Sequence, residues 1–334
     1  MKTYSADRLY WLKHHIPVTR EEYLDITAHA NVLPPAFPRT VYIEIGASCN
    51  LNCTFCSKPS RRAFLSEMTQ ETIHRVITEC GTHGTYGLYF HLFNEPLLHC
   101  HKLLPAITHA KTVGIPIVAV TTNITPLTKH RMGQLIVAGL DTIHLSFEGA
   151  NKTTYEQSRG VSYAVIRRRI FEALEVRAKI GKTNDAGRLM PWMAISMVHT
   201  TESQDEIDAF LTEWKGHVDD IEVRPALGFL GRTQAGIAIQ PVHRVPCRYM
   251  GDRLIIAADG TVTGCSVDVD AALNLGNVSE GDTLTSIWQS QRYRELWALH
   301  QWERWEDLPE PCRSCDSWDF TATQRSQHLH QTLR

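Results

Sequence analysis

Two groups of cysteines constrain the fold and the chemistry of this chain more than any other feature of its sequence. The front group places three thiols close together, at Cys49, Cys53 and Cys56. The back group is spread over a longer segment and consists of Cys247, Cys265, Cys312 and Cys315. Cysteine thiolates are the usual protein ligands of iron–sulfur clusters and common ligands of structural zinc. The spacing therefore predicts two separate metal centres.

The front cysteines follow the apolar run 41–45, which we interpret as a buried strand that brings three sulfurs to its C-terminal edge. Iron–sulfur clusters are normally held by four thiolates, so a loop that supplies three leaves one iron free to bind a ligand from outside the protein. Structural zinc is the competing interpretation, although it needs a fourth ligand and no histidine follows at a suitable spacing. A redox disulfide is favoured less, because the C-x2-C pair lies inside a three-cysteine loop.

Composition places the chain among ordinary globular proteins, with 43% hydrophobic and 21% charged residues. A formal net charge of -2 gives no electrostatic reason to expect a nucleic-acid partner. The first residues lack the apolar core of a signal peptide, and no stretch approaches the roughly 18 apolar residues of a membrane helix. We therefore expect a cytoplasmic protein without a membrane partner, and a reducing compartment also suits thiolates that bind iron.

Short β-rich apolar runs alternate with helical patterns between residues 40 and 225, which is typical of βα units and a parallel sheet. The predicted strands are 41–45, 86–93, 115–121, 142–147, 192–198 and 221–223. The predicted helices are 69–82, 102–112, 127–138, 162–180 and 203–215, the first opened by a capping Thr69. We predict an α/β fold, a partial (β/α)6 barrel with its functional loops at the C-terminal strand ends.

The segment CNLNCTFC, residues 49–56, resembles the signature of the radical S-adenosylmethionine (radical SAM) enzymes, with Phe55 where that family usually carries an aromatic residue. The resemblance implies a [4Fe-4S] cluster whose open iron binds the amino and carboxylate groups of S-adenosylmethionine. It further implies that an electron from the cluster cleaves the sulfonium and that the 5'-deoxyadenosyl radical removes a hydrogen atom from a substrate. In such a site the protein positions and shields the cofactor that carries out the difficult chemistry.

The loop after the second predicted strand resembles the Gly-Gly-Glu-Pro loop of this family and consists here of Asn94, Glu95 and Pro96. The resemblance implies that the backbone and the acid of this loop contact the methionine amino group. Asn94 stands where the family has its second glycine, and glycine is the residue that permits close backbone approach. The distance between this backbone and the ligand is therefore open at this point.

Strand ends further along the chain resemble other cofactor-binding segments of the family. Thr122 and Asn123 are similar to a T-N-G turn, with Ile124 replacing the glycine. Ser146 and Glu148 are similar to an S-x-D-G segment, whose acid often approaches the ribose hydroxyls, as acids do in dinucleotide folds. The alternative is that such side chains only satisfy backbone groups where the strands end.

Two more residues are candidate cofactor contacts. Arg159 follows the fourth strand, where the family often carries an arginine that meets a carboxylate, and a solvated surface arginine is the alternative. Ser196 lies on the fifth strand and either contacts the cofactor or is a core hydroxyl.

The back cysteines are carried by a predicted hairpin, 254–256 and 261–263 around an Asp259-Gly260 turn, and by a final C-x2-C pair. A helix is predicted at 284–299, before that pair. This segment resembles the truncated SPASM or "twitch" extension of radical SAM enzymes. Because no cysteine follows Cys315, the resemblance implies one auxiliary [4Fe-4S] cluster, and a zinc ribbon is the alternative.

The predicted organisation has four parts. Residues 1–39 form an N-terminal lead-in, 40–225 the radical SAM barrel, 226–246 a linker and 247–334 the small auxiliary-cluster domain with its hairpin and helix. The lead-in is too short for a separate peptide-recognition domain, which mildly favours a small molecule as substrate.

The predicted activity is radical oxidation or epimerisation of a hydroxylated small molecule, a sugar or an aminocyclitol, in specialised metabolism such as antibiotic biosynthesis. Among the resembling one-cluster enzymes are an aminocyclitol dehydrogenase and sulfatase-maturing relatives. Modification of a ribosomally made precursor peptide is the alternative, and a zinc-structured or electron-carrying scaffold is the non-enzymatic one. A reducing partner such as flavodoxin or ferredoxin is expected.

Four residues are candidate substrate contacts or hydrogen donors. Arg224 follows the sixth strand, and Asp268 and Asp270 follow Cys265. All three would equally suit ordinary surface or interdomain ion pairs. Cys100 lies near the Glu95 loop and is a candidate hydrogen donor to a substrate radical, whereas Cys80 is interpreted as a small core residue.

Overall fold

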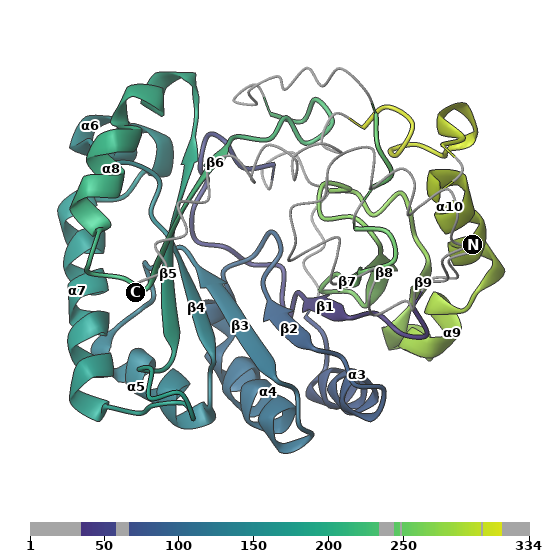
Figure 1. Cartoon of the computed structure of the whole chain (residues 1–334), viewed down its shortest axis with the longest axis horizontal. Coiled ribbons are helices and arrows are strands. Elements are labelled where there is room, and N and C mark those ends of the chain that lie inside the picture. Colours follow the sequence, from purple (N-terminus) through teal and green to yellow (C-terminus); the bar gives the residue numbers. More distant parts are fainter. Residues whose placement is uncertain (1–34, 58–66, 234–243, 248, 302, 316–334) are drawn as a thin grey trace, which may run out of the picture.

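The computed structural model describes residues 35–57, 67–233, 244–247, 249–301 and 303–315. One sheet with the strand order β6-β5-β4-β3-β2-β1-β7-β8-β9 organises these residues (Figure 1). Its strands are β1 Thr40–Ile43, β2 Gly87–Phe90, β3 Ile117–Thr122, β4 Thr142–Ser146, β5 Trp192–His199, β6 Asp220–Pro225, β7 Arg253–Ile256, β8 Thr261–Thr263 and β9 Gly276–Asn277. Strands β1 to β6 pair in parallel, which confirms the predicted α/β fold with a partial barrel.

Helices follow the parallel strands and cover the outer face of the sheet (Figure 1). In the barrel these helices are α3 Gln70–Thr82, η2 Pro96–His99, α4 Cys100–Thr112, α5 Lys129–Ala138, α6 Lys152–Arg159, α7 Tyr163–Ile180, η3 Thr201–Glu206 and α8 Ile207–Trp214. The hydroxyl of Thr69 accepts from Thr72 N and caps α3 as predicted. Helix α6 was not predicted, because its eight residues contain one buried apolar side chain, Tyr155, and so show no helical stripe.

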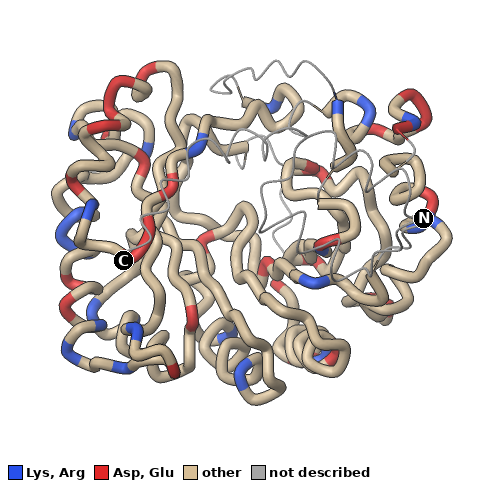
Figure 2. Tube along the Cα trace, in the orientation of Figure 1, with Lys and Arg blue, Asp and Glu red and all other residues tan. Residues whose placement is uncertain are grey.

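The two faces of the sheet differ in character because side chains alternate along a strand. The outer face is apolar, and its Val118, Ile143 and Ile195 are fully buried in the same core as Leu135 and Ile170 of the covering helices. The inner face carries polar and aromatic side chains. Figure 2 shows acidic and basic residues interspersed along the outer helices.

The C-terminal hairpin is confirmed, but it does not stand apart from the barrel. Strands β7 and β8 pair antiparallel around Gly260, whose φ of 89° suits a tight turn. Strand β7 also pairs in parallel with β1, from Thr40 opposite Arg253 to Ile43 opposite Ile256. The hairpin therefore extends the barrel sheet, which the predicted division into separate domains did not include.

The predicted helix 284–299 is two helices, α9 Leu284–Trp288 and α10 Gln291–Gln301, preceded by η4 Val278–Glu280 and followed by η5 Trp305–Asp307. Ser290 separates them, and its hydroxyl accepts from Tyr293 N at the start of α10. Most of the predicted lead-in and linker lies outside the described residues, as do 316–334. Within the described part of the chain, no helix combines the length and the apolar character needed to span a membrane.

Candidate active site

The front cysteines lie in the loop that follows β1, at the C-terminal edge of the sheet. Burial raises the pKa of Cys53 to about 11, and the neighbouring Cys56 and Cys49 raise it further while Arg159 lowers it. Thr54 N in this loop donates to Ser158 O of α6 at 3.0 Å, so the loop is docked on the helix that carries Arg159. The three thiols thus lie close enough for Cys49 and Cys56 to affect the pKa of Cys53, and loading them with metal must release protons.

The turn after β3 contacts this cysteine loop directly. Asn123 Nδ2 donates to Cys49 Sγ at 3.6 Å and to Asn50 Oδ1 at 3.1 Å, while Asn123 Oδ1 accepts from Thr125 N. Ile124 is fully buried and has a φ of 72°, a left-handed conformation that is unusual for a β-branched residue. The turn thus keeps the conformation that glycine would adopt freely, although this chain has isoleucine there.

Glu95 joins the loop after β2 to the same turn. Its carboxylate accepts from Leu97 N at 3.0 Å, from the Thr122 hydroxyl at 2.8 Å and from Asn123 N at 2.6 Å. Burial raises the pKa of Glu95 to about 7, although these hydrogen bonds oppose the shift. Through these bonds the carboxylate caps η2, whose first residue is Pro96, and fixes the end of β3.

Asn94 carries an unsatisfied donor beside this loop. Its Oδ1 accepts from Leu92 N at 3.2 Å, whereas its Nδ2 is buried without a hydrogen-bond partner among the described residues. A buried donor without a partner costs free energy, so the site suits a ligand that offers an acceptor here.

A buried ion pair lies beside the front loop. Arg159 Nη1 lies 3.7 Å from Glu148 Oε1, and both side chains are almost completely buried. The Glu148 carboxylate also accepts from the Ser146 hydroxyl and from Val198 N, and Arg159 Nη2 donates to Ser146 O. The guanidinium carbon lies 5.9 Å from the Phe55 ring centroid. Arg159 is therefore buried beside a carboxylate of the protein and is not a solvated surface arginine, while its predicted contact with the cofactor stays a prediction.

The inner face of the sheet is lined with hydrogen-bonding side chains from four strands. Ser196 lies opposite Ser146, and Thr121 Oγ1 bonds to His91 Nδ1 at 3.1 Å. Burial, together with His144 and Arg224, lowers the pKa of His91 to about 3, so the ring is neutral at physiological pH. Arg224 Nη2 lies 3.3 Å from Glu222 Oε2. Arg224, one of the predicted substrate contacts, thus belongs to a polar cluster on this face.

The other predicted substrate contacts have partners within the chain. Asp268 accepts from Thr263 Oγ1 and from the backbone N–H groups of Ala272 and Leu273, so it shapes the loop after β8. Asp270 pairs with Arg232. Cys100 begins α4 and donates to Leu97 O at 3.2 Å, and its pKa is raised by burial. The proposed roles of these residues toward a substrate stay predictions.

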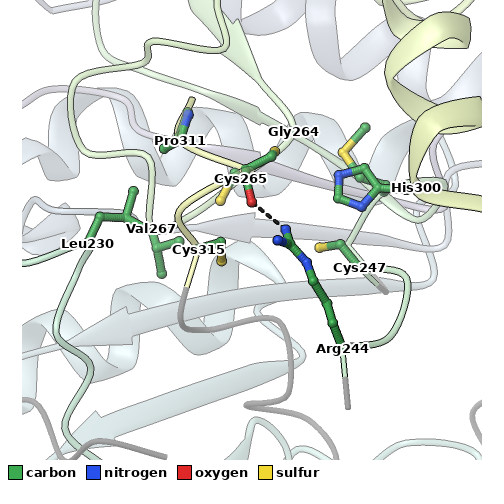
Figure 3. A pocket seen from close by; sticks show the side chains of 11 residues that line it. Leu230, Arg244, Cys247, Gly264, Cys265, Val267, His300, Pro311 and Cys315 are labelled. Carbon is green, nitrogen blue, oxygen red and sulfur yellow. Dashed lines mark hydrogen bonds between the residues drawn. The ribbon is translucent and has the colours of Figure 1, made fainter. Parts of the chain in front are cut away.

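The back cysteines surround one pocket in the C-terminal part of the molecule (Figure 3). The pocket is lined by Leu230, Arg244, Cys247, Met250, Gly264, Cys265, Val267, His300, Pro311, Cys312 and Cys315. Burial raises the pKa of Cys265 far above its ordinary value, and Cys247, Cys315 and Cys312 raise it further. Burial likewise raises the pKa of Cys312 to about 12. Four thiols around one space suit a closed cluster site.

The described residues contain no group of three His, Cys, Asp or Glu side chains arranged to hold a metal ion. The four back cysteines nevertheless line one pocket. The donor set of both cysteine groups is all thiolate, which is the chemistry that iron–sulfur clusters use.

Sequence reasoning missed several polar residues near both sites. On the inner face they are His91, His144 and Glu222, and in the pocket they are Arg244 and His300. Alternation was the available signal for His144 and Glu222, because polar residues recur at every second position of β4 and β6. No comparable signal exists for His300, whose place depends on how α10 packs.

The chain belongs to the radical SAM superfamily, which matches residues 43–211. Residues 247–316 match SPASM, an iron–sulfur cluster-binding domain. These matches confirm the predicted family and its cofactors, which are [4Fe-4S] clusters and S-adenosylmethionine. The SPASM match favours an iron–sulfur cluster over zinc in the segment that carries the back cysteines.

Particular relatives are more distant. The chain is 28% identical over 201 residues to a GTP 3',8-cyclase of Chlorobaculum tepidum, covering 58% of this chain and 55% of that protein. It is 25% identical over 236 residues to a PqqA peptide cyclase of Xanthomonas axonopodis pv. citri, covering 68% and 60%. The chain thus spans little more than half the length of these curated relatives.

Among solved structures, the fold is similar to that of BtrN in complex with AdoMet and 2-DOIA. The TM-score is 0.58 at 15% identity, and the likeness covers 84% of this chain and 93% of that one. At this identity the likeness supports the fold alone.

Proposed function

We propose that this radical SAM enzyme removes a hydrogen atom from a hydroxylated small molecule, a sugar or an aminocyclitol, and that the outcome is oxidation or epimerisation. Cys49, Cys53 and Cys56 would hold the cluster that binds S-adenosylmethionine. The back cysteines would hold the auxiliary cluster. When bound, the first cluster would supply the electron that cleaves S-adenosylmethionine, and in an oxidation the second would accept the electron that the substrate radical loses.

The residues around the front loop fit a ligand with both charged and hydroxyl groups. Asn94 Nδ2 is a buried donor without a partner among the described residues, so it suits an acceptor on the methionine moiety. Asn123, Glu95 and Arg159 hold the surrounding loops in place through the bonds described above. Their proposed role is therefore to preorganise the binding site, which lowers the entropic cost of positioning reactants.

The polar inner face of the sheet carries the proposal for the substrate. His91, Thr121, Glu222 and Arg224 supply neutral and charged hydrogen-bonding groups on the face turned away from the outer helices. A substrate rich in hydroxyl groups needs many such partners, because each buried hydroxyl left unpaired costs free energy. An apolar substrate would form no hydrogen bonds with these groups.

Modification of a precursor peptide is the second candidate, and the similarity to a PqqA peptide cyclase favours it. A peptide would also find donors and acceptors on a polar face. The two candidate functions differ in their substrate, a small molecule or a peptide. An activity assay therefore distinguishes them, whereas the fold does not. A reductant such as flavodoxin or ferredoxin would deliver electrons in either case.

Anaerobic reconstitution followed by iron, sulfide and zinc analysis tests the metal assignment. Two four-iron clusters predict about eight irons per chain. The Cys49→Ala, Cys53→Ala, Cys56→Ala variant should retain about half of the iron, and so should its back-group counterpart. Cys80→Ala removes a buried thiol outside both groups and serves as the matched control. Zinc at the back cysteines would overturn the auxiliary-cluster assignment.

Product analysis tests the reaction. With dithionite as reductant, 5'-deoxyadenosine should form and should increase with a true substrate. Deuterium on the reactive carbon of candidate sugars and aminocyclitols should appear in 5'-deoxyadenosine. Oxidation yields a carbonyl product, whereas epimerisation needs a hydrogen donor and should stop in Cys100→Ala. Transfer of deuterium from a peptide, with none from any small molecule, would favour the second candidate.

A further inference from the structure

His300 on α10 is a buried polar side chain that the proposed function does not use. It is 2% exposed, and both of its ring nitrogens lack a hydrogen-bond partner among the described residues. A neutral imidazole carries one N–H donor and one acceptor. Leaving such groups unpaired in the protein interior costs free energy. A bound group in the space beside His300 would explain why these nitrogens have no partner in the protein.

The space beside His300 is the pocket of the back cysteines. His300 lines it together with all four thiols, and Figure 3 shows its ring on the same wall as Cys247. The other polar lining residue, Arg244, is engaged in part: its Nη1 donates to Arg313 O and its Nη2 to Cys312 O, whereas its Nε is buried without a partner among the described residues. Apart from the cysteines, His300 is the pocket-lining polar side chain that has no hydrogen bond to any of its side-chain nitrogens among the described residues.

Packing holds the His300 ring in place. It meets Trp305 edge-on, with ring centroids 6.3 Å apart, and Trp305 lies beneath the Arg244 guanidinium at 4.9 Å. His300 sits in the last turn of α10, so its backbone position is set by the helix. A ring fixed in this way offers its nitrogen to the pocket without a further ordering cost.

We propose that the His300 ring N–H donates a hydrogen bond to a sulfur of the auxiliary cluster or of its thiolate ligands, and that this bond raises the reduction potential of the cluster. The inference rests on the proposed auxiliary cluster. Hydrogen bonds to the sulfurs are one of the terms that set the potential of such clusters. The bond stabilises the reduced state more, because that state carries one additional negative charge. An acceptor of substrate electrons gains driving force from this shift.

The test isolates the back cluster and measures its potential. In the Cys49→Ala, Cys53→Ala, Cys56→Ala background, the remaining cluster is titrated anaerobically and followed by electron paramagnetic resonance. His300→Phe keeps an aromatic ring without a donor and should make reduction about tenfold less favourable, about 59 mV for a one-electron couple. His300→Gln restores an N–H and should recover part of the loss. Met250→Leu changes the same pocket without changing a donor and should leave the potential unaltered.

A second measurement does not depend on any substitution at His300. With 15N-labelled histidine, pulsed resonance on the reduced cluster should show weak coupling to one ring nitrogen. A strong coupling would mean that His300 is a ligand, and the absence of coupling would mean that it does not touch the cluster. Either result overturns the inference, as does an unchanged potential in His300→Phe.

These failures are distinguishable from failure of the proposed function. If the background protein with native His300 binds no iron at the back cysteines, the auxiliary cluster itself is wrong, and the inference is overturned with it. If the cluster forms but its potential ignores His300, only the inference is wrong.

Discussion

At the scale of residues, buried carboxylates hold the loops of the site together. Glu44, at the end of β1, accepts from Phe93 N and from Ala258 N and so joins the loops after β2 and β7. Glu95 and Glu148 join other strand ends in the same way. A carboxylate has several acceptor positions and forms strong bonds with N–H groups, which suits it to this task.

The buried pair of Glu148 and Arg159 gives the first prediction. Glu148→Gln leaves the Arg159 guanidinium buried without its counter-charge, so the free energy of unfolding should fall by about 3–5 kcal/mol. Glu172→Gln is the matched control, because its partner Arg168 is exposed and 3.9 Å away, and it should cost less than about 1 kcal/mol. Urea unfolding measures both, and equal effects of the two changes would contradict the prediction.

The pH dependence of stability should report on Glu95. Its pKa is about 7 in the folded chain against 4.5 for the unperturbed group, so between these values the folded state holds a proton that the unfolded state has released. Stability from this group is therefore lost as pH rises from 4.5 to 7, by about 3 kcal/mol, and is constant above that range.

Glu95→Gln should remove this slope, as measured by urea unfolding of the metal-free chain at several pH values under reductant. Glu202→Gln is the control, because hydrogen bonding lowers the pKa of the exposed Glu202 and moves its titration below this window. A slope that persists in Glu95→Gln would assign it to another group.

At position 124 the glycine variant should be more stable than the alanine variant, which reverses the usual order of stability. Both Ile124→Ala and Ile124→Gly remove a buried side chain, but at a φ of 72° the glycine variant should be more stable by about 1 kcal/mol. Val137, exposed on α5, is the control, and there alanine should be the more stable by a similar amount. Thermal unfolding of the four variants tests this prediction. If alanine were the more stable residue at both positions, the strain argument would be refuted.

The sequence predicted which residues lie at the site. It predicted less well which side chains those residues contact. The cysteine spacing and the strand-end motifs placed Cys49, Asn123 and Glu148 at one edge, because parallel strands end together. The partners were not predictable, since the Asn123 contact with Cys49 and the Arg159 contact with Glu148 depend on loop packing. His300 was missed for the same reason.

At the scale of elements, the parallel strands were predictable and the pairing of β7 was not. Strands β1 to β6 alternate with helices along the chain, and such order dictates a parallel sheet. Strand β7 lies more than two hundred residues after β1 in the chain. Nothing in the sequence of β7 indicates that it pairs with β1. A free edge of β1 would expose unpaired backbone groups, which β7 covers.

Removing β7 should therefore expose the barrel to aggregation. A chain that ends after residue 233 leaves the edge of β1 open beside the buried Val41 and Ile43, so its soluble fraction should fall sharply. A chain that ends after residue 301 retains β7 to β9 and α10 but lacks the final cysteine pair, and it is the matched control. Sedimentation of both distinguishes edge exposure from metal loss, and equal aggregation would contradict the edge argument.

At the scale of the whole molecule, contacts across the sheet edge join the barrel to the C-terminal segment. The Glu79 carboxylate of α3 accepts from Leu284 N and Thr285 N at the start of α9. Arg75 of the same helix donates to Asp282 O and to Val278 O. Buried residues of both parts belong to one hydrophobic core. Both cysteine groups are thus carried by a single packed body.

This continuity predicts that the two parts unfold together. Glu79→Ala leaves the Thr283 cap of α9 in place but removes the carboxylate that accepts from Leu284 N and Thr285 N, and it should cost about 1–2 kcal/mol, as cap losses do. If the molecule is one cooperative unit, hydrogen exchange should accelerate in α9 and also in β1, and a single thermal transition should shift. Glu71→Ala, an exposed change near the start of α3, should leave both unaltered. Acceleration confined to α9, with β1 unchanged, would show that the C-terminal segment unfolds as an independent domain, as its sequence alone suggests.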